Sequence, residues 1–133
     1  MVKKLVAVFS LAIVLTSLAG CVVQSQPTQA GNTIIMGPNN YVSGAPGNSI
    51  TIKVGQTITF IDDKATGSPH ILVIGMNGAA QAAAGAPDFG ANGRSFQPDN
   101  IPWTTPPWTT AGTYHVSCTI HPTTMNLTVI VTA

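Results

Sequence analysis

Short β-branched segments separated by turn residues dominate the sequence, and this pattern limits the folds that it can adopt. Residues 49–54 read SITIKV, with Ile50, Ile52 and Val54 at alternate positions. Alternation with a period of two is typical of a half-buried strand. Turn-forming stretches such as SGAPG and DDKATGSP bound these segments, and none of them has helical periodicity. We therefore expect an all-β protein.

Six strands are predicted from this pattern, at residues 33–36, 49–54, 56–61, 70–75, 112–119 and 126–132. Strands this short and this regularly interrupted indicate a small antiparallel sandwich or barrel. Residues 77–100 differ, because they are rich in Ala, Gly, Asn and Gln. We expect them to form a long surface loop, either functional or poorly ordered.

Residues 1–20 have the features of an export signal. Lys3 and Lys4 precede the apolar run LVAVFSLAIVL, which is too short for a comfortable membrane span, and small residues follow it. Leu18-Ala19-Gly20-Cys21 resembles the bacterial lipobox, which implies that Cys21 carries the lipid. The alternative is an ordinary secretory signal followed by an incidental cysteine. A lipidated chain would be anchored outside the cytoplasmic membrane, in the bacterial cell envelope.

The part of the chain after the signal divides into a tether and one domain. Residues 21–32 are polar and without apolar periodicity, so we interpret them as a flexible tether. Residues 33–133 form the domain. Its charged side chains are nearly balanced: Lys53, Lys64, Arg94, Asp62, Asp63, Asp88 and Asp99. This balance offers no basic patch for nucleic acid, and a tethered single domain is expected to be a monomer.

Cys118 is left without a cysteine partner if Cys21 is lipidated, because the chain has two cysteines. A lone thiol in an oxidising compartment needs protection, and metal ligation provides it. Alternation within GTYHVSC places Tyr114 and Val116 on the same face as Cys118. The thiol is therefore expected to point inward.

The segment CTIHPTTM brings three metal-ligating residue types close together. Pro122 prevents a regular strand from continuing, and the resulting tight loop can gather Cys118, His121 and Met125. His70 opens another strand and can meet this loop. Two imidazoles, one thiolate and a weak thioether are the ligand set of a blue-copper electron-transfer site. The plainer alternative is that Cys118 and Met125 are ordinary core residues.

The pattern of His70 followed by Cys118-x2-His121-x3-Met125 resembles the cupredoxins, and most closely the plastocyanin and amicyanin group of small blue copper proteins. VGQTITF and AGTYHVSC are similar to the strands that lead to the ligands of that family. The resemblance implies a Greek-key β-sandwich of about eight strands, with one type 1 copper ion near one end. It also implies reversible one-electron transfer between Cu(I) and Cu(II).

One feature departs from the family pattern. Three residues separate His121 from Met125, whereas plastocyanin-like loops usually have four and amicyanin has two. The resemblance therefore leaves the axial distance of Met125 open.

Other residues of the same types have structural interpretations. We expect His115 on the solvent side of its strand, and Met36 and Met76 in core or loop packing. Trp103 and Trp108 either cover the core or mark a docking surface.

These observations predict an extracytoplasmic electron carrier, anchored in the membrane, that exchanges electrons with redox partner proteins. They do not favour an enzyme, because copper oxidases and nitrite reductases use more histidines than the three present here. Two alternatives remain. One is a copper-binding lipoprotein for copper trafficking or protection, and the other is a metal-free β-sandwich surface module.

Overall fold

The computed structural model describes residues 31–133, and the expectations for the export signal, Cys21 and most of the tether fall outside them. The described strands are β1 (Asn32–Met36), β2 (Tyr41–Ser43), β3 (Ser49–Lys53), β4 (Ile58–Asp62), β5 (His70–Ile74), β6 (Arg94–Phe96), β7 (Trp103–Thr104), β8 (Gly112–Cys118) and β9 (Asn126–Thr132). One 3-10 turn, η1 (Pro46–Asn48), lies between β2 and β3, and it is the one helical element within this range. None of the helical structure in this part of the chain is long enough to cross a membrane.

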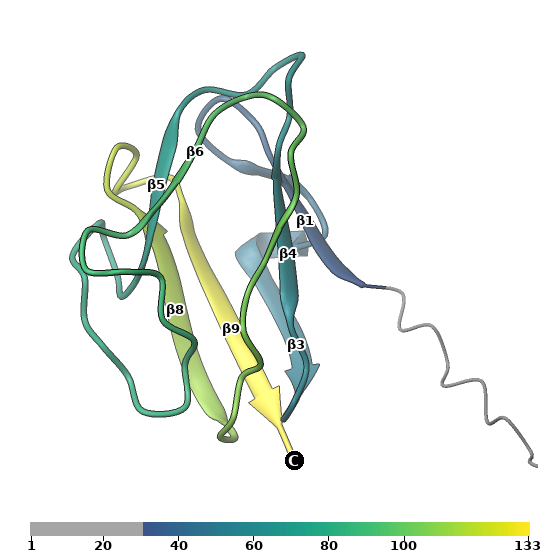
Figure 1. Cartoon of the computed structure of the whole chain (residues 1–133), viewed down its shortest axis with the longest axis vertical. Coiled ribbons are helices and arrows are strands. Elements are labelled where there is room, and N and C mark those ends of the chain that lie inside the picture. The colour runs from purple at the N-terminus through teal and green to yellow at the C-terminus, as the bar shows by residue number, and fades with distance from the viewer. Residues whose placement is uncertain (1–30) are drawn as a thin grey trace, which may run out of the picture.

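The strands form two sheets that face each other, as Figure 1 shows. One sheet has the order β2-β1-β4-β7 and the other has the order β3-β9-β8-β5-β6. The predicted all-β sandwich is confirmed.

The expectation of purely antiparallel sheets is wrong. β1 pairs with β4 in parallel, and β3 pairs with β9 in parallel. Between β1 and β4 the chain adds β2 to one sheet and crosses to the other sheet at β3. Such a crossover is what allows two strands to lie parallel.

The strand periodicity correctly identified the core face. In β9 the side chains of Leu127, Val129 and Val131 are buried, and in β8 Tyr114 and Val116 are buried with Cys118. Trp108 is completely buried and packs 5.2 Å from Tyr114, measured between ring centroids. Each fully buried aliphatic side chain contributes roughly 1.5–3 kcal/mol to the free energy of folding.

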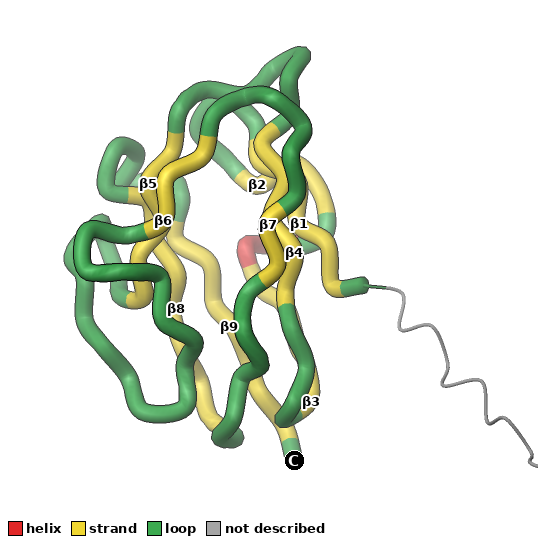
Figure 2. The backbone as a smooth tube through the Cα atoms, viewed as in Figure 1, coloured by secondary structure: helices red, strands yellow, loops and turns green. Residues whose placement is uncertain are grey.

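The segment between β5 and β6 is only partly the surface loop that we expected. It lies beside β5 and β8 (Figure 2), where the Tyr114 hydroxyl is 3.1 Å from the carbonyl oxygen of Ala84. Phe89 from this loop is buried, with its ring edge-on to Phe60. Residues 94–96 then form β6 against β5. The loop is therefore anchored to the sandwich at several points.

Candidate metal centre

Two of the predicted ligands lie on adjacent strands of one sheet. His70 is the first residue of β5 and Cys118 is the last residue of β8. These strands are antiparallel, with Leu72 opposite Cys118, so both residues lie at the same end of the sandwich. The Cys118 Sγ atom is 3.8 Å from His70 Nδ1, and neither residue is exposed.

The loop between β8 and β9 brings His121 to the same point. It lies at the end of the sandwich opposite the C-terminus (Figure 1). The backbone N–H of Met125 donates to the His121 carbonyl over 3.0 Å, and the N–H of Cys118 donates to the Met125 carbonyl over 3.0 Å. The Asn126 side-chain amide donates to the Pro122 carbonyl over 2.8 Å. These bonds fold the loop back, so that His121 Nδ1 lies 3.7 Å from Cys118 Sγ.

The resulting cluster could hold a metal ion. The ligand atoms of His70, Cys118 and His121 all lie within 4.8 Å of one another. Protein nitrogen and sulfur ligands sit roughly 2.0–2.3 Å from a bound metal, so the separations of 3.8 and 3.7 Å between Cys118 Sγ and the two Nδ1 atoms allow them to share a single ion. Two imidazoles and a thiolate are the equatorial set of a type 1 copper site, which these residues therefore fit.

The fourth predicted residue, Met125, is buried in the core directly before β9. Its backbone is hydrogen-bonded to both Cys118 and His121, so it closes the loop that carries the cluster.

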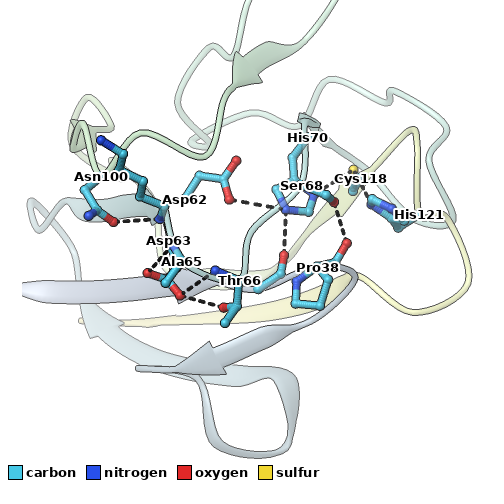
Figure 3. Close-up of polar contacts among 12 residues, drawn as sticks. Pro38, Asp62, Asp63, Ala65, Thr66, Ser68, His70, Asn100, Cys118 and His121 are labelled. Atoms are coloured by element: carbon cyan, nitrogen blue, oxygen red, sulfur yellow. Dashed lines mark hydrogen bonds and ion pairs between the residues drawn. The ribbon is translucent and has the colours of Figure 1, made fainter.

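A backbone carbonyl orients the His70 ring. Its Nε2 atom lies 2.9 Å from the Gly37 carbonyl oxygen, which can only accept a hydrogen bond. The Nε2 atom therefore carries the hydrogen, and Nδ1 presents its lone pair towards Cys118. Nearby, the Ser68 hydroxyl donates to the Pro38 carbonyl over 2.5 Å and links the turn after β1 to the start of β5 (Figure 3).

Two buried groups beside the cluster were missed in the sequence analysis. Asp62 is unexposed, with its Oδ1 atom 3.7 Å from His70 Nε2. Burial raises the pKa of this carboxyl group, and the neighbouring His70 partly offsets the shift. The Tyr41 hydroxyl is also buried, and its pKa is raised above the usual range by burial and, to a smaller extent, by the charge of Cys118. Alternation of Ile58, Phe60 and Asp62 in β4 would have placed the carboxyl group on the core face.

The other residues of interest lie apart from the cluster. His115 lies on the opposite face of β8 from Cys118 and is half-buried. Met36 is fully buried and Met76 is 48% exposed, in agreement with packing and loop positions respectively. Trp108 belongs to the core. Trp103 is half-buried, stacks on Phe60 and has the Arg94 guanidinium 5.2 Å above its ring centre.

Comparisons with known proteins agree with this architecture at the level of the fold. No protein-family model matches the sequence, and no curated protein matches it. Solved structures of amicyanin do match. A reduced amicyanin variant is 23% identical with a TM-score of 0.55, and the match covers 80% of this chain and 87% of that one.

Two further amicyanin structures give similar values. A reduced Cu(I) form of a variant at pH 4 is 21% identical with a TM-score of 0.56, over 80% of this chain and 87% of that one. Amicyanin from Paracoccus versutus is 21% identical with a TM-score of 0.55, over 81% of this chain and 86% of that one. The described part of this chain therefore has the cupredoxin β-sandwich fold of amicyanin.

Proposed function

We propose that this protein is a type 1 copper protein that carries single electrons between redox partners outside the cytoplasm. The observation that supports the proposal most strongly is the buried thiol of Cys118, placed within 3.8 Å of two imidazole nitrogens at one end of the sandwich. Copper, when bound, supplies a one-electron couple between Cu(I) and Cu(II). The similarity to amicyanin structures, one of them a Cu(I) form, supports the same assignment.

In this proposal His70, Cys118 and His121 would hold the ion, and the Met125 thioether would be the fourth ligand. Thiolate and thioether sulfur suit Cu(I), while imidazole suits both oxidation states. Cys118 is held by the pairing of β8 with β5, and His70 by the pairing of β5 with β6, so both residues would keep their positions in either oxidation state. Complete burial of these two residues also excludes water from the thiol.

The exposed edge of the centre is where we place electron exchange. His121 is half-buried, and its neighbour Ile120 is 48% exposed. The segments 75–79 and 119–125 contain no Asp, Glu, Lys or Arg. A partner protein would therefore meet a largely uncharged surface and bind weakly and briefly.

The N-terminal sequence supports the proposed location at the outer side of the membrane. A lipid on Cys21 would hold the domain at the membrane surface, and residues 21–32 would give it freedom to reach membrane-bound partners. Mass spectrometry of the intact protein tests this anchor, because Cys21→Ser would abolish the lipid mass.

The proposed copper site is tested by the visible absorption spectrum after addition of Cu(II), using the chain from Gln24 onward. We expect one equivalent to produce an intense thiolate-to-copper band that ascorbate bleaches. Cys118→Ser should lack this band. His115→Gln should keep it, because His115 lies on the opposite face of β8. Absence of the band from the unsubstituted chain would leave a metal-free β-sandwich module as the better interpretation.

A further inference from the structure

Asp62 is a buried acidic residue at a position where hydrophobic packing would favour an apolar side chain. The residue is unexposed, and neither carboxyl oxygen has a hydrogen-bond partner among residues 31–133. Burying a polar group without a partner destabilises the folded state, and an unpaired carboxylate costs more than a neutral group. An apolar residue at this position in β4 would continue the pattern of Ile58 and Phe60.

The His70 ring is the group that Asp62 faces. Figure 3 shows the carboxyl group directed towards the ring, with Oδ1 3.7 Å from Nε2. Within the described residues, His70 is the one basic side chain with a nitrogen atom within 4.0 Å of this carboxyl group. The nearest acidic neighbours lie away from the ring: Asp63 is hydrogen-bonded to Thr66, and Asp99 to the backbone N–H of Ile101.

Gly67 leaves the space that the carboxyl group occupies. A Cβ atom at this position would lie 2.1 Å from Asp62 Oδ1 and 2.4 Å from the Asp63 carbonyl oxygen. Any larger residue would therefore displace the carboxyl group from the ring. The turn between β4 and β5 is thus shaped around this side chain.

We propose that Asp62 is a positioning residue of the metal centre, which acts on the Nε2–H side of His70 together with the Gly37 carbonyl oxygen and makes Nδ1 a stronger ligand. The inference rests on the proposed function. Carboxylates behind a ligating imidazole fix its orientation and raise its basicity, and losing such a partner typically lowers metal affinity by about 10–100-fold. In its ionised form the carboxyl group also favours Cu(II) over Cu(I), so replacing Asp62 should raise the reduction potential.

The test compares Asp62→Asn and Asp62→Leu with the unsubstituted full-length protein in mild detergent. Cu(II) affinity is measured by competition with a chelator, the potential by redox titration, and thermal unfolding on the metal-free protein. Asp63→Asn is the matched control, because it removes the same charge one residue away, from a half-buried carboxyl group that is hydrogen-bonded to Thr66 and not directed towards His70. We expect both Asp62 variants to bind Cu(II) about 10–100-fold more weakly and to have a raised potential.

The metal-free stability separates a positioning role from a structural one. Replacing a buried, unpaired carboxyl group by an apolar residue of similar size should leave the unfolding temperature of Asp62→Leu unchanged or higher. Lower affinity accompanied by a lower metal-free unfolding temperature in both variants would overturn the proposal. Affinity and potential equal to those of Asp63→Asn would also overturn it, while leaving the copper site itself intact. If the unsubstituted protein forms no thiolate–copper band, the proposed function fails, and this inference fails with it.

Discussion

The candidate centre joins two regions of different construction. The sheet supplies His70 and Cys118, which are completely buried and belong to paired strands. The loop at residues 119–125 supplies His121, which is half-buried and held by backbone hydrogen bonds that close the loop on itself. The sheet therefore sets the position of one imidazole and the thiol, whereas the length and sequence of the loop set the other imidazole and Met125.

This difference shows how one fold can assign its stability to the sheet and the adjustment of the metal centre to the loop. Pairing of β5 with β8 and with β6 fixes the interior half of the centre as part of the core. The loop half faces the surface and can change length at a small cost in entropy, about 0.6 kcal/mol for each doubling. We therefore expect the two halves to respond differently to substitution.

The largest expected contrast is between the two histidines. His121→Gly and His70→Gly should each abolish the visible band of the copper-loaded protein. Added imidazole should restore the band only in His121→Gly, because that position opens to solvent while His70 is completely buried. Absorption spectra with increasing imidazole check this. Equal rescue of both variants would contradict the distinction between a buried and an accessible ligand.

A smaller effect, on the stability of the fold, is expected from replacing Ser117, whose side chain links β8 to a neighbouring turn. Its buried hydroxyl accepts a hydrogen bond from the Gly78 backbone N–H over 3.0 Å. Ser117→Ala should lower the free energy of unfolding by about 1–3 kcal/mol, because the N–H loses its buried partner. The absorption band should be unchanged, since Ser117 faces away from the cluster.

Denaturant unfolding of the metal-free protein measures this loss. Thr51→Ala is the control, because Thr51 is exposed on β3 and its substitution should have an effect within about 0.5 kcal/mol. A shifted absorption band in Ser117→Ala would show that the sheet half of the centre depends on the turn at Gly78.

The smallest expected effect concerns salt. Segments 75–79 and 119–125 carry no charged side chains, so the electron self-exchange rate should depend weakly on ionic strength. Strong electrostatic steering changes association rates by roughly 10-fold or more. Stopped-flow or NMR line-broadening measurements between low and high salt check this, and a steep decrease with ionic strength would disprove an uncharged docking surface.

Much of the sheet half could be predicted from the sequence. Alternation in GTYHVSC placed Cys118 inward and His115 on the opposite face, and the structure confirms both. The limits of β9 match the predicted strand. Such segments can be predicted from the sequence, because burial on one face of a sheet imposes a hydrophobic period of two residues.

The remainder depends on contacts between distant segments. β6 and β7 have three and two residues, which is too short for a periodic signal. Parallel pairing of β1 with β4 arises from the path of the chain between the sheets, and no local pattern encodes it. Asp62 alternates with Ile58 and Phe60, but its relation to His70 appears only when the turn at Gly67 is folded.

Cyclic voltammetry of the copper-loaded protein tests the central claim most directly. An electron carrier should give a reversible wave of one electron per chain, unchanged over repeated cycles, because the same residues hold the ion in both oxidation states. Loss of copper on reduction, or an irreversible wave, would contradict electron transfer and favour a role in copper trafficking or protection.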